Sequence, residues 1–222
     1  MKIAFYFSTR SNDPKNTPAY KSLSKFLNHD TLFYSANNTE GLSKRYNEKI
    51  LNLKERFDKI VFLHDDVYVD DYYVCEKLEK AHKEFDIVGL AGGINPKIQE
   101  LALWHLMCGG FGSNNLRGAV AHPTDSGSQI AVTSFGPTPS RVTILDGLFL
   151  SVDLRKAANV NWKFNENYTF HHYDIASSID ANNKKLKLGV APIWVIHKSP
   201  GLLNINDKVF LDSQERFLNE YR

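Results

Sequence analysis

The sequence contains few cysteines, little net charge and no long apolar run, and each scarcity excludes a class of protein. Two cysteines among 222 residues, Cys75 and Cys108, are too few for a disulfide-rich scaffold or a four-cysteine zinc site. They predict free thiols in a reducing compartment. The 27 basic and 25 acidic side chains leave a net charge of +2. This balance disfavours a protein that binds nucleic acid or an anionic membrane through a broad basic field.

Long apolar segments are also missing. No stretch approaches the ~18–20 apolar residues of a membrane span, and the N-terminal run Ile3–Phe7 is too short for the core of a signal peptide. The apolar and aromatic fractions, 42% and 12%, are nevertheless sufficient for a real hydrophobic core, and the length fits one large domain or two small ones. We therefore expect a soluble, cytoplasmic protein without a membrane span.

The first ninety residues alternate between two kinds of pattern. Short apolar runs typical of buried strands lie at Ile3–Phe7, Thr31–Tyr34, Lys59–Leu63 and Ile87–Leu90. Between them lie segments in which apolar residues recur at helical spacing. This order, β-α-β-α-β-α-β, predicts a parallel sheet covered by helices on both faces.

The second half has a different pattern. Ten of the 13 glycines lie between Gly89 and Gly147, and the helical spacing disappears there. Short alternating runs predict strands, partly antiparallel, at Arg117–Ala121, Ser128–Phe135 and Val142–Val152. The remaining predicted elements are a helix over Tyr173–Asn182, strands at Lys185–Val190 and Ile193–His197, and a final helix capped by Asp207. We expect one α/β domain with its functional loops in this half.

The sharpest motif is the run Val61–Val67, in which an apolar strand ends in His64, Asp65 and Asp66. Ligands of an open parallel sheet bind at the carboxyl ends of its strands. Hard cations take oxygen ligands, and Mn²⁺ also accepts an imidazole. The run therefore predicts a site for a divalent cation and a phosphate. The alternative is that the carboxylates only charge the N-terminus of the next helix.

Two further motifs place carboxylates in expected loops. Asp146 precedes Gly147 between apolar residues, which puts a carboxylate where the backbone can approach a ligand closely; the alternative is a tight turn or a bulge. Asp174 opens a predicted helix after the pair His171-His172 and is a candidate functional carboxylate. The alternative is that its charge only stabilises the start of that helix. Neighbouring histidines point in different directions, so we expect one of the pair to be a pocket wall rather than a metal ligand.

The fourth motif is His197, which ends an apolar strand and is followed by Lys198. A histidine at a strand end with a lysine beside it can complete a metal site and neutralise a phosphate. The alternative is a loop histidine with satisfied hydrogen bonds. All four motifs lie at predicted strand ends or helix starts, where α/β sheets place their sites.

The order of these motifs resembles that of a GT-A glycosyltransferase of the family-2-like type. The resemblance extends from Ile3 to Gly201, and the segments that carry it are Asn38–Asn47, Val61–Asp66, Leu145–Val152, Phe164–Glu166 with Tyr173–Asp174, and His197. The chain departs from the family pattern at two positions. His64 stands where the first Asp of the Asp-any-Asp metal motif is common, and Tyr173 replaces the Glu before Asp174. In size and layout the chain also resembles the small capsid-glycosylating transferases encoded by chlorella viruses.

The resemblance implies a GT-A, Rossmann-like fold, with a mostly parallel central sheet flanked by helices and a smaller antiparallel part in the second half. One domain would cover residues 1–222, with a nucleotide-binding half over 1–100 and an acceptor and catalytic half over 101–222. The implied reaction is an inverting transfer of a sugar from a nucleoside-diphosphate sugar, with UDP expected, to a hydroxyl of a glycan or glycoprotein. For a viral protein this would be capsid glycosylation in the host cytoplasm.

The resemblance also assigns the chemistry to residues. Asp66 and His197 would hold Mn²⁺ or Mg²⁺, which stabilises the negative charge of the leaving diphosphate as a Lewis acid. Asp174 is expected to be the general base that activates the acceptor hydroxyl. Asp146 is the second candidate for the base, and otherwise it would hydrogen-bond sugar or acceptor hydroxyls.

The expected donor-binding residues follow the first two strands and the metal motif. They are Ser8, Thr9, Arg10 and Asn38 around the nucleotide base, Asp65 near the ribose, Lys198 near the phosphates, and Arg45 as a further source of positive charge. The glycine-rich stretch Gly109–Gly127 is predicted to be a mobile flap or an acceptor wall.

Three other functions stay open on these observations. His64-Asp65 reads as the HD doublet of metal-dependent phosphohydrolases, but those place it on a helix of an all-α fold, and here it ends a strand-like run. A sugar-nucleotide pyrophosphorylase needs a glycine-rich phosphate loop after the first strand, and Phe7–Ser11 contains no glycine. The third is a non-catalytic carbohydrate-binding module, against which the intact carboxylates of the motifs argue.

Overall fold

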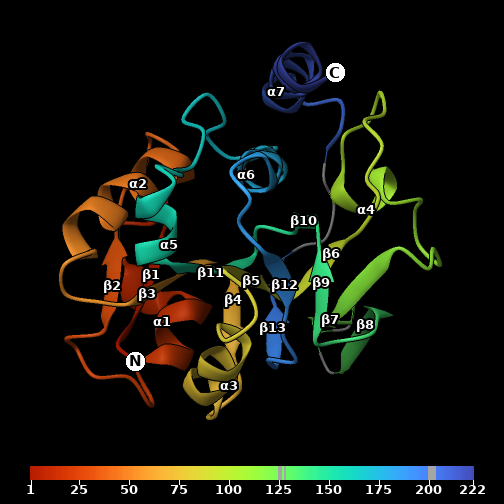
Figure 1. The fold of residues 1–222 in the computed structure, drawn as a ribbon. Coiled ribbons are helices and arrows are strands. Elements are labelled where there is room, and N and C mark those ends of the chain that lie inside the picture. The colour runs from red at the N-terminus through yellow and green to blue at the C-terminus, as the bar shows by residue number, and fades with distance from the viewer. Residues whose placement is uncertain (125–126, 128, 200–203) are drawn as a thin grey trace.

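A seven-stranded sheet crosses the centre of the computed structural model, which describes residues 1–124, 127, 129–199 and 204–222 (Figure 1). Its strands are, in spatial order, β2 (Leu32–Ser35), β1 (Ile3–Ser8), β3 (Lys59–His64), β11 (Phe149–Asp153), β5 (Ile87–Gly89), β12 (Leu188–Val190) and β9 (Ser140–Val142). Only β11 and β9 run opposite to the other five, as their antiparallel pairings with β3, β5 and β12 require. The predicted mostly parallel central sheet is therefore confirmed.

A second, smaller sheet is largely antiparallel. Its order is β10 (Ile144–Leu145), β6 (Ala91–Gly93), β7 (Leu116–Pro123), β13 (Val195–His197) and β4 (Val67–Val69), with β8 (Ile130–Gly136) paired to β7. The pairing of β7 with β13 is parallel, and the other pairings in this sheet are antiparallel. The antiparallel part expected in the second half is thus present, although β4 and β6 come from the first.

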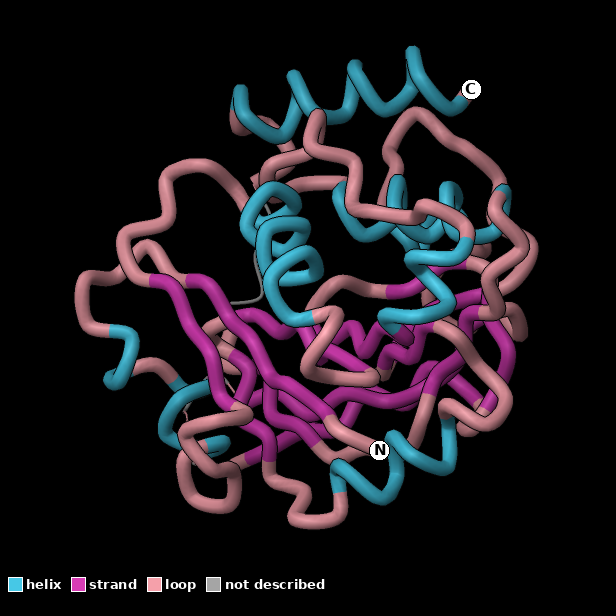
Figure 2. The backbone as a smooth tube through the Cα atoms, turned by 60° about the vertical axis from the view of Figure 1, so that its left-hand side comes forward, coloured by secondary structure: helices cyan, strands magenta, loops and turns pink. Residues whose placement is uncertain are grey.

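Helices lie on both sides of the strands, above and below them in Figure 2. They are α1 (Pro18–Leu23), α2 (Leu42–Leu53), α3 (Val74–Ala81), α4 (Trp104–Met107), α5 (Leu154–Asn159), α6 (Tyr173–Asn183) and α7 (Lys208–Tyr221), with a 3-10 turn at Pro14–Asn16. In Figure 1, α2, α5, α6 and α7 lie above the strands, and α1 and α3 lie below. This layered α/β architecture confirms the predicted fold class.

The apolar runs of the first half form the interior of the central sheet. All six residues of β1 are buried, and β1 pairs with β3 from Ile3 opposite Lys59 to Ser8 opposite His64. Tyr46 of α2 stacks on Phe62 of β3 with ring centroids 4.4 Å apart, so the helix covers the sheet through aromatic contact. The predicted alternation of strands and helices over this half is confirmed, with β4 inserted before α3.

The second half was predicted less completely. Asp207 caps α7 as expected, since its carboxylate accepts a hydrogen bond from the amide of Val209 over 3.2 Å. The run Val142–Val152 forms three short strands rather than one. The glycine-rich stretch Gly109–Gly127 is not one flap, because β7 occupies Leu116–Pro123; residues 125 and 126 lie outside the described part. Both Cys75 and Cys108 are free.

The pairing of β4 with β13 brings distant motifs together at one edge of the molecule. His197 lies opposite Val67, and the amide of Lys198 donates to the carbonyl of Asp66 over 2.9 Å. His64 ends β3 a few residues earlier. The sheets therefore carry two of the four motifs to neighbouring strand ends, which is where sheets of this kind bind ligands.

Candidate active site

Two histidines and one carboxylate form a cluster at these strand ends. Each of His64, Asp66 and His197 offers a ligand atom that lies within 4.8 Å of the others. The carboxylate Oδ1 of Asp66 approaches Nε2 of His197 to 3.3 Å. Among the described residues this buried Oδ1 has no hydrogen-bond partner, which is costly unless another group binds it. The cluster thus has the donor atoms and the unsatisfied oxygen of a divalent-cation site.

The charges in the cluster are mutually stabilising. Burial alone would lower the pKa of His197, but the Asp66 carboxylate beside it outweighs burial and raises that pKa. Burial likewise acts to raise the pKa of Asp66, and the contact with His197 reverses this, so the carboxyl stays ionised at neutral pH. Burial lowers the pKa of His64, which keeps its imidazole neutral and able to coordinate a cation.

Tyr173 orients His64 from the start of α6. Its hydroxyl donates to the carbonyl of Gly147 over 2.7 Å and lies 2.9 Å from Nε2 of His64. Because the hydroxyl proton goes to the carbonyl, Nε2 of His64 is the donor in the second contact, and Nδ1 keeps its lone pair. Tyr173, which replaces the Glu of the family pattern, therefore holds one tautomer of His64. A further histidine, His122 of β7, was not predicted from the sequence and lies with its ring centroid 5.6 Å from that of His197.

Asp174 follows Tyr173 and lies against Gly147. The carboxylate accepts hydrogen bonds from the amides of Gly147 over 3.0 Å and of Ile175 over 2.9 Å. Burial, followed by the negative charge of Asp146, raises its pKa to about 7. A carboxylate with this pKa can accept a proton near neutral pH, which is the property of a general base.

Gly147 is needed here because α6 packs directly against it. A Cβ at this position would lie 2.4 Å from the hydroxyl oxygen of Tyr173 and 2.9 Å from Cβ of Asp174. The sequence predicted that a ligand could approach the backbone at Asp146-Gly147 closely, and the structure shows that α6 packs against Gly147. The alternative, a tight turn, is also present, since Oδ1 of Asp146 accepts from the amide of Leu148 over 3.0 Å. The charge of Asp146 acts on Asp174, His64 and His197, so this carboxylate lies close to both the base candidate and the cluster.

Trp104 of α4 holds Asp146 in place. Its indole Nε1 donates to Oδ2 of Asp146 over 2.7 Å. Trp104→Phe keeps an aromatic ring but removes this bond and part of the buried indole, so we expect the free energy of unfolding to fall by at least about 1.5–3 kcal/mol, the value for a hydrogen bond to a charged group. Urea denaturation measures the change. Trp194→Phe, at a side chain that is 40% exposed, is the control, and equal effects in the two variants would contradict the prediction.

A cavity of about 590 Å³ adjoins the cluster. It brings together five of the predicted donor-binding residues, which are Ser8, Thr9, Arg10, Asn38 and Asp65. The lining also contains residues of the second half, most of which were not predicted from the sequence: Thr169, Phe170, His171, Asp207 and Val209. His171 is thus the pocket wall expected of the histidine pair, whereas His172 is buried and bonded to Ser213 and Gln214. Phe170 connects the cavity to the cluster, because its ring stacks on His64 with centroids 5.9 Å apart.

Two predicted residues lie elsewhere. Arg45 is not among the side chains that line the cavity, and its guanidinium pairs with Glu40 at 2.6 Å and Glu48 at 2.9 Å on the surface of α2. The ammonium of Lys198 lies 5.1 Å from the ring centroid of Tyr68, beside the cluster but directed at an aromatic ring. The positive charge of both side chains is thus engaged by other groups of the protein.

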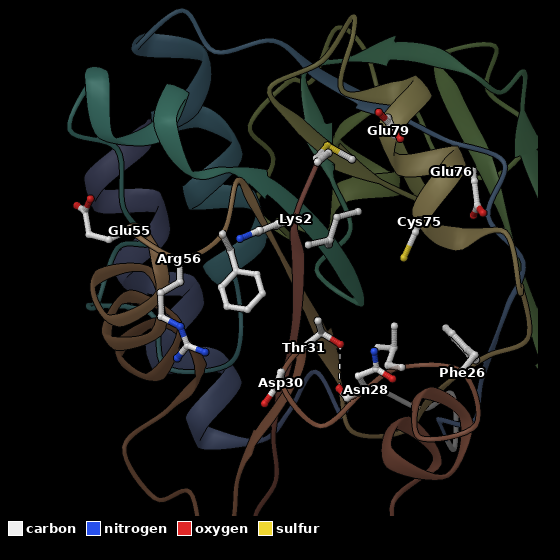
Figure 3. A pocket seen from close by; sticks show the side chains of 14 residues that line it. Lys2, Phe26, Asn28, Asp30, Thr31, Glu55, Arg56, Cys75, Glu76 and Glu79 are labelled. Carbon is white, nitrogen blue, oxygen red and sulfur yellow. Dashed lines mark hydrogen bonds between the residues drawn. The ribbon is translucent and has the colours of Figure 1, made fainter.

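A larger cavity, of about 1000 Å³, lies at the opposite ends of the strands (Figure 3). Figure 3 shows Cys75 and Glu76 of α3 on one side of it and Glu55 and Arg56 on the other. It opens where β1 and β2 begin, far along the strands from the cluster at their carboxyl ends. Size therefore does not mark the site in this molecule, and the smaller cavity beside the cluster is the candidate.

The fold and this arrangement define a class of protein, an α/β enzyme of the GT-A type. The model of the glycosyltransferase-like family matches residues 22–221, and the chain belongs to that family. It is a glycosyltransferase. No curated protein matches the sequence. Among the described residues, none of the helices combines the length and apolar character that a bilayer crossing requires.

Solved structures share the fold at low sequence identity. The crystal structure of A197 from STIV has a TM-score of 0.52 and 10% identity over 94% of this chain and 100% of that one. The crystal structure of GalNAc-T7 with UDP, GalNAc and Mn²⁺ has a TM-score of 0.57 and 11% identity. That match covers 99% of this chain and 48% of GalNAc-T7, so this chain spans about half the length of that relative.

Proposed function

We propose that the protein is a metal-dependent, inverting glycosyltransferase that moves a sugar from a UDP-sugar to a hydroxyl of a glycan or glycoprotein. The observation that carries the proposal is the combination of groups at the site. The cluster of His64, Asp66 and His197 and a carboxylate with a pKa of about 7, Asp174, both lie within reach of the charge of Asp146. A direct displacement needs both, because the cation stabilises the leaving group while a base activates the acceptor hydroxyl.

The cation belongs at the cluster. Asp66 and His197 are its primary ligands in this proposal, and His64 joins them through Nδ1. Two imidazoles and one carboxylate suit Mn²⁺ better than Mg²⁺, which prefers oxygen ligands only. When bound, the cation neutralises the charge of the leaving diphosphate as a Lewis acid. The structure of GalNAc-T7, which contains UDP and Mn²⁺, supports this pairing of nucleotide and metal.

The donor nucleotide occupies the cavity of about 590 Å³. Ser8, Thr9, Arg10 and Asn38 hold the base, and Asp65 lies near the ribose. This volume is within the usual range for small-molecule sites. Residues 1–100 supply one wall as the nucleotide-binding half, and 101–222 supply the other wall and the catalytic carboxylates. The side chains of Arg45 and Lys198 reach the phosphates only by leaving their present partners.

Asp174 is the general base and Asp146 the second candidate for that role. With its pKa near 7, Asp174 is partly ionised at neutral pH and removes the proton of the acceptor hydroxyl as the new glycosidic bond forms. Asp146 otherwise accepts hydrogen bonds from sugar hydroxyls. A viral capsid glycoprotein is the acceptor that the resemblance to capsid-glycosylating transferases suggests.

Thermal melting with UDP and Mn²⁺ tests the donor and the metal together. At a UDP concentration of about 100 times the Kd, binding adds about 2.7 kcal/mol to the free energy of unfolding. We therefore expect the melting temperature to rise by about 5–10 °C. ADP, CDP and GDP are the matched controls for the base, and EDTA for the metal. No shift with any nucleotide would overturn the donor assignment, and an equal shift with UDP in EDTA would overturn the metal dependence.

A further inference from the structure

Four aromatic side chains form a packed cluster beside Asp146. We call Trp104, His105, Phe111 and Phe135 the aromatic shelf. Trp104 meets Phe135 edge-on with ring centroids 5.1 Å apart, and Phe135 stacks with Phe111 at 6.1 Å. Phe111 lies 4.6 Å from His105, which packs back against Trp104 at 5.6 Å. The inner end is fixed to the site, because Trp104 donates to the carboxylate of Asp146 over 2.7 Å.

The shelf becomes more exposed with distance from Asp146. Trp104 is 8% exposed, Phe135 is half-buried and Phe111 is 69% exposed. Aromatic rings that are packed together and yet open to water at one end are a feature of ligand-binding surfaces. The shelf belongs to α4, β8 and the loop before β7, on the right-hand side of Figure 1, whereas β1, β2 and α2 lie on the left. It is therefore separate from the cavity assigned to the donor.

A cavity of about 310 Å³ lies along the outer part of the shelf. Phe111 and Phe135 line it together with the polar residues Ser113, Asn114, Arg117 and Ser134. Arg117 is held at this cavity, since its Nη1 donates to the carbonyls of Asn114 over 2.6 Å and Leu116 over 2.7 Å. The lining thus combines two phenyl rings with fixed polar groups.

This combination matches the chemistry of a sugar ring. A pyranose has a face of C–H groups, which packs on an aromatic ring, and a rim of hydroxyls, which needs hydrogen-bond partners beside that ring. A cavity of this size is at the small end of ligand sites and suits one or two such rings rather than a folded protein surface. An unglycosylated serine or threonine would present no comparable amphipathic ring.

We propose that the aromatic shelf is the acceptor subsite and that it binds a pyranose ring of the acceptor glycan against Phe111 and Phe135. The inference rests on the proposed function and makes it more specific, because the acceptor is then a sugar and not a bare serine or threonine. The shelf directs the acceptor towards Asp146, whose position Trp104 fixes. Phe111 is a specificity residue and takes no part in the chemistry.

Saturation-transfer NMR on the full chain tests the subsite without requiring turnover. The probes are methyl pyranosides of glucose, galactose, mannose, xylose, fucose and N-acetylglucosamine, and a peptide that contains serine and threonine, each with UDP and Mg²⁺. We expect at least one pyranoside to bind and Phe111→Ala to weaken that binding about tenfold or more. Tyr72→Ala is the matched control, because Tyr72 is also 69% exposed and lies outside the shelf; this variant should bind as the wild type does.

Three results would overturn the inference: binding of no pyranoside by a protein that binds UDP, equal binding by wild type and Phe111→Ala, or a peptide signal that depends on Phe111 while the pyranosides give none. UDP binding is measured by melting temperature both in these samples and in parallel samples that contain Mn²⁺. A protein that binds UDP but no pyranoside contradicts the acceptor subsite alone, whereas one that binds neither contradicts the proposed function as well.

Discussion

Asp174→Asn is expected to reduce the transfer rate by about 10²–10⁴-fold and to leave UDP binding unchanged. Asparagine keeps the shape of the side chain and an oxygen that accepts from the amide of Gly147, but it loses the acceptor for the amide of Ile175 and cannot remove a proton. The rate is measured as UDP released from the UDP-sugar that gives the largest melting shift, with water or a bound pyranoside as the nucleophile. The shift itself measures donor binding in the variant.

Asp180→Asn is the matched control, since this carboxylate lies on the same helix and accepts from the hydroxyl of Tyr221 over 3.1 Å. Its turnover should stay close to that of the wild type. Full turnover by Asp174→Asn would contradict the assignment of the base. If Asp146→Asn is then the inactive variant, the role passes to Asp146.

The raised pKa of Asp174 also predicts two pH dependences. The base must be ionised, so kcat/KM should rise with pH and level off above about 7. The pKa of this carboxyl in the folded protein lies above its ordinary value of 3.8. Its contribution to the free energy of unfolding is therefore complete at pH values below 3.8 and is lost as the pH rises through about 7. Asp174→Asn should therefore melt at a higher temperature than the wild type at pH 8. A smaller difference is expected at pH 5, where the wild-type carboxyl is largely protonated.

Asp66→Ala is expected to weaken Mn²⁺ binding by at least about 100-fold and to abolish the part of the UDP shift that depends on the metal. The variant removes the one carboxylate of the cluster, whose Oδ1 is buried and lies 3.3 Å from His197. Titration of the protein with Mn²⁺ in an electron paramagnetic resonance experiment measures the affinity directly, without a donor or an acceptor.

Asp70→Ala provides the comparison, because Asp70 is an exposed carboxylate that follows β4, the strand that Asp66 precedes. It should bind Mn²⁺ as the wild type does. An unchanged affinity in Asp66→Ala would move the metal away from the cluster. A loss of affinity in both variants would indicate a general effect of negative charge instead of coordination.

The elements that were predicted well are those whose sequence signal lies within the element or next to it. The continuous apolar runs of β1 and β3 are buried on both faces, and Asp207 satisfies the first amides of α7, so each signal lies within a few residues of the element. The strand β4 and the helix α4 were missed. Each has only three or four residues, and β4 is a strand because β13 pairs with it.

The candidate site divides in the same way. Taken alone, the sequence determined which groups are available. Asp66, Asp146 and His197 lie beside the ends of apolar runs, whose burial leaves their polar neighbours at the sheet edge, and Asp174 lies at the start of a helix. Only the tertiary structure decided which groups meet. Pairing of β4 with β13 joins Asp66 to His197, and the packing of α6 on Gly147 places the half-buried Asp174 near Asp146. Low solvation and a neighbouring charge then raise its pKa, and neither quantity exists until the chain has folded.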